Sequence, residues 1–527
     1  MKLYRAFATV GGLTMVSRVL GFVRDILVAA ALGSGWVADA FFVAFRFPNL
    51  FRRLFAEGAF NAAFVPLFAK RLEGEGEAAA KGFAEEALAG LLAVLIPLSL
   101  VAILAMPWLM ALLAPGFLED RAKYELAVEL TQVAFPYLAC MSLVALLSGM
   151  LNSMRRFWAA AAAPILLNVV LIAAIGFAIQ LGYARRPEAG RVLAIGVFVA
   201  GFAQLAMLWI AVRRAGMTVG LVRPRAGEDM RRLVRLGIPG LVAGGITQIN
   251  IVVGTIIASL QAGAVSYLYY ADRLYQLPLG IVGVAVGVVL LPDLSRHLRN
   301  NDHAAAKDSQ NRSLEFALLL TLPASIALAV AAGPIVSVLF ERGAFTPADT
   351  PATAYALAAF AIGLPAFVLI KVFQPGFFAR EDTRTPMRYA AVNMAVNVAG
   401  SLVLFFALQA MGLMPHVGIA LATSLAGWVN ALLLWRRLVT LDQFEVDARL
   451  RRNVPLIALA SLAMGLMVAA LTLPLGPYMA SGASLATRVM ALGLLVGAGA
   501  GVFAVLILAA GVLSLDQLGR FLRRRRP

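Results

Sequence analysis

Apolar runs of about 20 residues recur along the whole chain, and they restrict its fold more than any other feature. A helix of that length spans a hydrocarbon layer about 30 Å thick. Of the 527 residues, 61% are hydrophobic and 14% are charged, whereas a soluble domain usually carries about a quarter charged residues. Because only short polar connectors separate the runs, the sequence predicts an all-α integral membrane protein.

About fourteen transmembrane helices account for the apolar runs. An even number of spans places both ends of the chain on the same side of the membrane. The predicted spans cover residues 8–31, 37–69, 83–113, 126–151, 158–182, 192–212, 234–261, 265–295, 313–340, 352–378, 387–410, 416–435, 454–474 and 486–513.

Basic residues divide unevenly between the two sides of the predicted membrane. The side of the termini holds 31 Lys and Arg residues, the opposite side holds 7, and 7 lie within the spans. The positive-inside rule therefore predicts that both termini are cytoplasmic. It also explains the net charge of +17 without nucleic acid as a partner. The connector with Arg185, Arg186 and Arg191 departs from this bias.

The first twelve predicted spans contain an internal repeat. Residues 38–46 resemble residues 265–273 at an offset of 227, and residues 64–67 resemble 290–293 at an offset of 226. Spans that are six apart run in the same direction, so the repeats are parallel and related by a pseudo-two-fold axis along the membrane normal. We expect one six-helix lobe in residues 1–214, a second in 215–452, and two extra helices with a basic tail in 453–527.

Charged residues within the spans are the candidates for function, because each costs roughly 2.5–3.5 kcal/mol at the centre of a membrane helix. Spans one, two and eight carry more cations than anions. The guanidinium group of arginine binds phosphate through two parallel hydrogen bonds, so this surplus indicates an anionic cargo. Internal salt bridges that stabilise the helix bundle are the alternative. The residues are Arg18, Arg24, Arg46, Arg52, Arg53 and Arg273 against Asp25, Asp39, Glu57 and Asp272.

Several of these charges lie in motifs that carry a family resemblance. The first half contains SRVLGFVRD at 17–25, ADAFF at 38–42 and PNLFRRLFAEGAF at 48–60, and the second half contains YYADRL at 269–274 and PGFFAR at 375–380. With these motifs the chain resembles the MurJ/MviN family of lipid II flippases, in the MOP exporter superfamily. The resemblance implies two six-helix lobes and two further helices that form a groove for the lipid tail.

The resemblance also implies roles for individual residues. The substrate-binding residues, which would hold the diphosphate and sugar of the head group, are Arg18, Arg24, Arg52 and Arg273. The residues that would support the cavity or couple it to an energy source are Asp25, Asp39, Asn49, Arg53, Glu57, Ser266, Asp272 and Gln276. Gln276 stands where some relatives have a glutamate, which puts in doubt any coupling scheme that needs a carboxylate there.

The function that follows from the resemblance is the flipping of lipid II, an undecaprenyl-diphosphate-linked disaccharide peptide, by alternating access during peptidoglycan and cell-wall biogenesis. The protein would lie in the bacterial cytoplasmic (inner) membrane, with lipid II, membrane lipids and other cell-wall synthesis proteins as partners. Two alternatives stay open. One is a flippase for another polyprenyl-diphosphate glycan, and the other is a cation-coupled multidrug exporter of the same superfamily.

An enzymatic function is not expected. The sequence has no GxxxxGK[ST] motif for nucleotide binding, and His297, His303 and His416 lack the spacing of metal ligands. We therefore expect no catalytic residue, no cofactor and no metal site.

Overall fold

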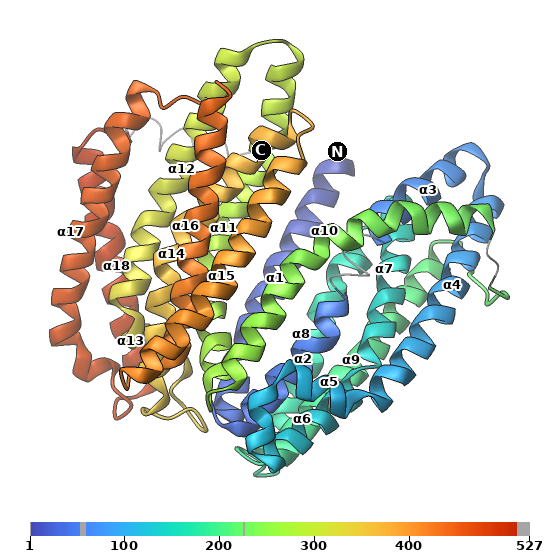
Figure 1. The fold of residues 1–527 in the computed structure, drawn as a ribbon, viewed down its shortest axis with the longest axis horizontal. Helices are drawn as coiled ribbons and strands as arrows, with labels where there is room; N and C mark the ends of the chain where they lie inside the picture. Colours follow the sequence, from blue (N-terminus) through green and yellow to red (C-terminus); the bar gives the residue numbers. More distant parts are fainter. Residues whose placement is uncertain (1, 53–59, 225–226, 514–527) are drawn as a thin grey trace. The chain divides into compact units, whose positions relative to one another are not determined.

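The computed structural model describes residues 2–52, 60–224 and 227–513. Within these ranges the regular secondary structure is entirely helical (Figure 1). The chain forms two compact units, Met1–Ser266 with Gly343–Phe345, and Tyr267–Arg342 with Thr346–Pro527, which are called unit 1 and unit 2 below. The boundary falls inside one helix, α11, after its third residue. The lobe boundaries expected from the repeat differ from these units and remain a prediction.

The helices of unit 1 precede those of unit 2 along the chain. Unit 1 contains α1 (Lys2–Leu32), α2 (Trp36–Arg52), α3 (Phe60–Gly74), α4 (Glu77–Leu104), α5 (Met106–Leu113), the 3-10 helix η2 (Pro115–Glu119), α6 (Arg121–Ala134), α7 (Tyr137–Ser153), α8 (Trp158–Gln180), α9 (Pro187–Arg214) and α10 (Glu228–Ser259). Unit 2 contains most of α11 (Ala264–Arg299), then α12 (His303–Val330), α13 (Ala332–Phe340), α14 (Asp349–Phe378), α15 (Arg384–Ala410), α16 (Pro415–Thr440), α17 (Ala448–Met479) and α18 (Leu485–Ala509).

In the described residues, each predicted span falls on one helix or on two helices, and the all-helical membrane fold is confirmed. Ten helical segments in the described ranges are long and apolar enough to cross a membrane. Helices α1, α2 and α11 are not among the ten, and they carry charges that the sequence places within spans. The number of fourteen spans therefore remains a prediction.

Two helix breaks repeat the offset found in the sequence. The helix α4 gives way to α5 at Ala105, and α12 gives way to α13 at Ala331, which is 226 positions later. Pro107 and Pro334 lie in the first turn after each break. Proline fits a first helical turn, whereas in a helix interior it removes a backbone hydrogen bond because it lacks the N–H donor. The predicted spans 83–113 and 313–340 are therefore each two helices.

Carbonyl groups that lose their backbone donor to proline find partners on neighbouring helices. In α14, Pro365 cannot donate to the carbonyl of Ala361, and the Ser325 hydroxyl of α12 donates to it instead at 2.6 Å. In unit 1, Gln132 Nε2 donates to the carbonyl of Ile103 at 2.9 Å, four residues before a proline. Such partners allow membrane helices to contain proline without an unpaired carbonyl in the apolar phase.

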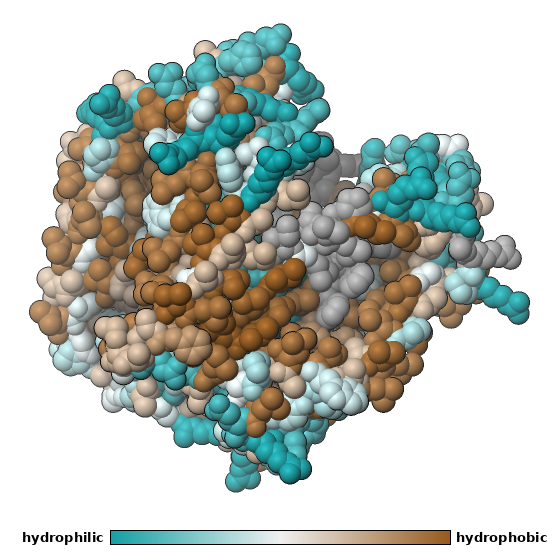
Figure 2. Space-filling view, in the orientation of Figure 1, coloured by the Kyte–Doolittle hydropathy of each residue, from teal (hydrophilic) through white to brown (hydrophobic). Residues whose placement is uncertain are grey.

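Hydrophobic side chains cover the flanks of the helices, and hydrophilic ones gather at their ends (Figure 2). Along α17 and α18 the exposed side chains include Leu459, Leu466, Leu473 and Val505. An apolar flank of this kind is stable against lipid but not against water. The two last helices therefore present a lipid-facing surface.

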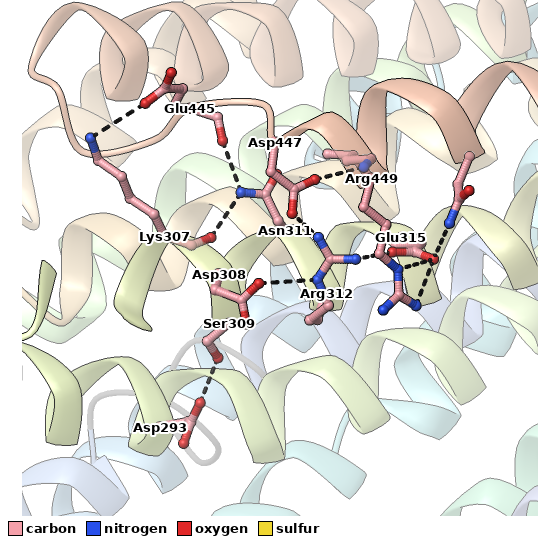
Figure 3. A network of polar contacts seen from close by, with 12 residues as sticks. Asp293, Lys307, Asp308, Ser309, Asn311, Arg312, Glu315, Glu445, Asp447 and Arg449 are labelled. Carbon is pink, nitrogen blue, oxygen red and sulfur yellow. Dashed lines mark hydrogen bonds and ion pairs between the residues drawn. The ribbon is translucent and has the colours of Figure 1, made fainter. Parts of the chain in front are cut away.

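One end of α17 is attached to α12 by a polar network around Glu315 (Figure 3). Arg312 of α12 donates to both Glu315 and Asp447. From α17, Arg449 Nη2 donates to Glu315 Oε1 at 3.1 Å and Asn453 Nδ2 donates to the same oxygen at 2.7 Å. Glu315 is only 6% exposed, so these donors compensate for its burial.

The start of α18 is attached to α13 by a single arginine. Arg488 donates to the carbonyl oxygens of Ser337 at 2.6 Å and Glu341 at 3.1 Å. These carbonyls belong to the last turn of α13 and the residue after it, and the carbonyl of Ser337 also accepts from the Glu341 amide at 3.0 Å. The α17–α18 pair is thus part of unit 2.

Candidate functional site

Arg24 and Asp25 form a buried ion pair in α1. Two guanidinium nitrogens of Arg24, Nη2 and Nε, donate to Asp25 Oδ1 at 2.7 and 3.1 Å. The third nitrogen, Nη1, donates to Asn168 Oδ1 of α8 at 2.9 Å, and the Phe45 ring of α2 has its centroid 5.8 Å from the guanidinium carbon. Groups from three helices therefore fix the orientation of this arginine.

Burial makes this pair costly to disturb. Arg24 is 8% exposed and Asp25 is 3% exposed. Removal of one partner from a buried pair leaves an uncompensated charge, which is strongly destabilising. A phosphate oxygen is an acceptor of the same kind as a carboxylate oxygen. Asp25 therefore balances the charge of Arg24 when no anion is bound, and a bound anion can accept hydrogen bonds from the same guanidinium group.

Asp39 lies at the centre of a second buried polar cluster. Its carboxylate accepts hydrogen bonds from Lys123 Nζ at 2.7 Å, the Gly263 amide at 2.8 Å, and the Ser266 amide and hydroxyl at 2.9 Å each. Asp39 and Ser266 are completely buried, and the Lys123 ammonium lies 4.1 Å from the centroid of the Phe117 ring. Hydrogen bonds between Asp39 and Ser266 thus connect α2 to the start of α11. A role in supporting the cavity or in coupling remains a prediction for both.

The other predicted residues of unit 1 are more dispersed. Arg18 is exposed on α1. Asn49 Nδ2 donates to the carbonyl of Phe45 at 2.7 Å, next to the carbonyl that Pro48 leaves without its helical donor. Arg46 Nη1 donates to Thr255 of α10 at 3.3 Å.

The structure does not describe the side chains of three predicted site residues. Arg52 is the last residue of α2, and its side chain is not described. Arg53 and Glu57 lie outside the described residues. Their assignments as substrate-binding and supporting residues remain predictions.

In unit 2, Asp272 and Arg273 are neighbours in α11 but do not have the same arrangement as the pair in α1. Gln276, one turn further on, donates its side-chain amide to Asp272. The Arg273 guanidinium carbon lies 4.7 Å from the centroid of the Tyr269 ring, one turn back. A carboxylate is therefore present in α11 close to the position where Gln276 replaces the glutamate of some relatives.

Two polar partners were not predicted from the sequence. Lys123 is a basic residue on the side of the membrane that is poor in Lys and Arg, and this exception was a signal for a structural or functional role. Asn168 is a polar residue in an otherwise apolar span. Neither signal identified Asp39 or Arg24 as the partner.

Metal binding has no support in the described geometry. No group of three or more His, Cys, Asp or Glu side chains is placed to hold a metal ion in the ranges that the structure describes. His416 accepts or donates a hydrogen bond at the carbonyl of Ala352, 2.9 Å away.

These features define the class of protein. It is a multi-pass membrane protein of the transporter type, with an arginine next to an aspartate in a helix of each unit. The family model described as "Lipid II flippase MurJ" matches residues 28–484. The chain belongs to this family.

Curated relatives match over almost the full length. The chain is 49% identical to the probable lipid II flippase MurJ of Rhizobium tropici, over 100% of this chain and 98% of that protein. It is 35% identical to the probable lipid II flippase MurJ of Rickettsia prowazekii (strain Madrid E), over 89% of this chain and 90% of the relative. The similarity therefore includes both units.

Solved structures show the same fold. A structure titled "Lipid II flippase MurJ, inward closed conformation" matches with a TM-score of 0.77 and 24% identity, over 95% of this chain and 98% of that one. An inward-facing multidrug resistance transporter of the MATE family, in the MOP superfamily, matches with a TM-score of 0.66 and 14% identity, over 83% of this chain and 98% of the other. These likenesses concern the fold.

Proposed function

We propose that this protein flips lipid II from the cytoplasmic to the outer leaflet of the bacterial inner membrane by alternating access. The observation that carries the proposal is the buried Arg24 in a membrane helix, with its donors directed at Asp25 and Asn168. A guanidinium in this position is suited to a diphosphate group. Family membership and the names of the relatives support lipid II as the cargo.

Four arginines bind the head group in this proposal. Arg18, Arg24, Arg52 and Arg273 hold the diphosphate and the sugar. The residues that support the cavity or couple it to an energy source are Asp25, Asp39, Asn49, Arg53, Glu57, Ser266, Asp272 and Gln276. The cargo supplies negative charge to an arginine-rich interior, so its binding lowers the electrostatic cost of those buried cations.

Movement of the head group requires a cycle of two conformations. The lobes 1–214 and 215–452 alternate between access from the two sides, while the polyprenyl tail stays in lipid beside residues 453–527. Both termini are cytoplasmic, and the cargo crosses without chemical change. A charge moved across the membrane gains roughly 2.3 kcal/mol per 100 mV, so the membrane potential is sufficient to bias the cycle. Other cell-wall synthesis proteins supply and consume the cargo.

Depletion of the protein tests the proposal. Lipid II is then expected to accumulate on the cytoplasmic leaflet, where an enzyme or reagent that acts only from outside cannot reach it. Lipid II that remains accessible from outside at its normal level would contradict the proposal. Accumulation of a different polyprenyl-diphosphate glycan would favour the alternative cargo.

Replacement of one arginine tests the site. The Arg24→Ala variant should lose lipid II flipping by two orders of magnitude or more per protein inserted in the membrane, about the cost of a lost charge-assisted contact with a buried group. Because the substitution removes the Arg24 partner of the buried Asp25, the amount of inserted protein is measured alongside. The matched control is Arg296→Ala, because Arg296 is an exposed arginine paired with Asp293 at the end of α11. Equal turnover by Arg24→Ala and Arg296→Ala would exclude Arg24 from the binding site.

A further inference from the structure

Three separate segments of the chain interlock at the C-terminal end of α1 in unit 1. They are the residues that end α1, the connector between α8 and α9, and the segment Gly343–Phe345. The last segment comes from the connector between α13 and α14, whose helices belong to unit 2. It is therefore covalently continuous with unit 2 and packed in unit 1.

Arg185 makes the central contacts of this interlock. Its Nε and Nη2 atoms donate to the carbonyl oxygen of Ala344 at 3.2 and 2.9 Å. Its own backbone amide donates to the carbonyl of Ala31 at 2.9 Å, and the Ala344 amide donates to the carbonyl of Ala30 at 2.7 Å. One arginine thus binds both the end of α1 and the inserted segment.

The backbone at the interlock has little freedom to vary. Gly33 has a φ of +66°, and a Cβ atom there would lie 2.5 Å from the carbonyl oxygen of Ala344. Gly343 has a φ of +59°, and a Cβ atom there would clash with the carbonyl oxygen of Ala30. Arg185 itself has a φ of +65°, which is uncommon for a residue with a side chain. The backbone conformations of all three segments therefore allow the segments to lie close together.

Side-chain burial agrees with this close approach. Ala344 is 5% exposed and Phe345 is 1% exposed. The segment is therefore covered while the interlock is intact, and reagents in water would reach Ala344 only after its release. Accessibility of Ala344 is a direct measure of the state of the interlock.

The position of Arg185 also resolves the exception in the charge distribution. The connectors at the end of α1, between α8 and α9, and between α13 and α14 all lie on the predicted side that is poor in Lys and Arg. Basic residues on that side oppose the orientation signal, so one that is present there needs another reason. The bidentate contact with Ala344 supplies that reason for Arg185, and Arg191 forms a separate pair with Glu129.

We propose that Arg185 is a positioning residue of the flipping cycle, which holds Gly343–Phe345 against the outer end of α1 and releases it when that end opens. The cycle rests on the proposed function, whereas the interlock is a property of the geometry alone. A hydrogen bond from a charged donor to a backbone carbonyl is stronger than a neutral one. Loss of the guanidinium should therefore shift the population toward the released state.

The test measures how fast a cysteine introduced at position 344 reacts from outside the cell. The reporter is Ala344→Cys, and a membrane-impermeant maleimide is the probe. The sequence contains one native cysteine, Cys140, which is 4% exposed within α7 and gives little background. The reporter protein must first accumulate in the membrane at the level of the protein without the introduced cysteine.

The test variant is Arg185→Asn, because asparagine tolerates a positive φ and preserves the backbone while it removes the guanidinium. The matched control is Arg186→Asn, which removes the same charge from the neighbouring residue. No hydrogen bond or ion pair of the Arg186 side chain occurs among the described residues. We expect labelling of the reporter cysteine to become about tenfold faster with Arg185→Asn, as for one or two lost charge-assisted bonds. With Arg186→Asn it should stay within about twofold of the rate in the reporter alone.

Rescue by a conservative change separates positioning from general packing. The Arg185→Lys variant keeps the charge but lacks the fork, so its labelling rate should lie between those of the reporter and Arg185→Asn. If Arg185→Asn does not accumulate in the membrane, faster labelling in Arg185→Lys than in the reporter supports the proposal. Unchanged labelling in the variant that does accumulate, or equal acceleration by Arg186→Asn, would overturn it.

The outcome is distinguishable from a failure of the proposed function. Faster labelling with Arg185→Asn in a protein whose depletion leaves lipid II correctly distributed would retain the interlock and reject lipid II as the cargo. Unchanged labelling together with loss of flipping by Arg24→Ala would reject the proposed role of Arg185 in the flipping cycle. It would leave the proposed function, lipid II flipping, in place.

Discussion

Helices α1 and α11 each carry an arginine next to an aspartate, and the side-chain contacts of these residues differ between the two units. In α1, Arg24 and Asp25 bind one another and are both buried. In α11, Asp272 accepts from the amide of Gln276 and Arg273 lies over the Tyr269 ring. The same two residue types are thus an ion pair in unit 1 and take part in two separate one-turn contacts in unit 2.

The difference shows how the environment decides what a charge pair does. Around Arg24, the additional acceptor comes from Asn168 of another helix, so tertiary contacts fix a buried guanidinium. Arg273 is half-buried, and the ring beside it belongs to its own helix. We infer that Arg24 is a rigidly held binding group.

Removal of the aspartate should affect the two pairs to different degrees. Asp25→Ala leaves the buried Arg24 uncompensated, and we expect the free energy of unfolding to fall by about 3–5 kcal/mol. Asp272→Ala removes an amide contact at a half-buried position and should cost about 1 kcal/mol. Unfolding of the purified proteins in detergent measures both. The double variant Arg24→Ala with Asp25→Ala should regain most of the stability without flipping; equal losses for Asp25→Ala and Asp272→Ala would remove the distinction.

The amide partner of Arg24 gives the next largest effect. Asn168→Ala removes the acceptor of Arg24 Nη1, and we expect lipid II turnover to fall about tenfold, as for one hydrogen bond to a charged group. The control is Asn397→Ala, since Asn397 is a similarly buried asparagine and accepts from Thr423 Oγ1 at 3.1 Å. A similar decline in both variants would indicate a general packing defect.

A second carboxylate beside Asp272 should have a smaller effect. Gln276→Glu replaces the amide donor of Asp272 with a like charge one turn away, where such pairs are destabilising by a few tenths of a kcal/mol in isolated helices. The added negative charge opposes an anionic cargo, so we expect about a twofold to fivefold lower apparent affinity for lipid II. Gln409→Glu, at the end of α15, is the control for an added charge. An unchanged affinity would show that Arg273 and its surroundings do not contact the head group.

The smallest effect is expected from the aromatic neighbour of Arg273. Tyr269→Leu keeps an apolar side chain but removes the cation–π contact, which is worth about 0.5–2 kcal/mol. Arg273 is only half-buried, so the low end of that range applies and lipid II turnover should fall by no more than about twofold. Tyr389→Leu controls for the loss of a tyrosine elsewhere in unit 2. A larger loss than with Asn168→Ala would reverse the expected order of the two contacts.

Much of the fold follows from local properties of the sequence. An apolar run must be about 20 residues long to cross the hydrocarbon layer as a helix. The length of each run therefore predicts a helical span, and in the described residues every predicted span coincides with one helix or two. The repeat offset of 226 recurs in the breaks at Ala105 and Ala331. The breaks themselves were not predicted, because an apolar run continues unchanged across a proline that interrupts a helix.

The candidate site was predictable in its residue types and not in its contacts. Charges within spans single out Arg24, Asp25, Asp39 and Arg273 because they are costly in an apolar medium. Arg24 and Asn168 are 144 positions apart in the chain, and no local pattern predicts such a partner.

By itself the sequence determined that this protein is a helical membrane protein with arginine-rich spans, since both properties depend on composition and run length. Only the tertiary structure decided that Asp39 pairs with Lys123, 84 positions away, and that Arg185 binds Ala344, 159 positions away. The reason is that a buried charge must find its partner among whatever groups packing brings within hydrogen-bond distance. That choice depends on helices distant in sequence and close in space.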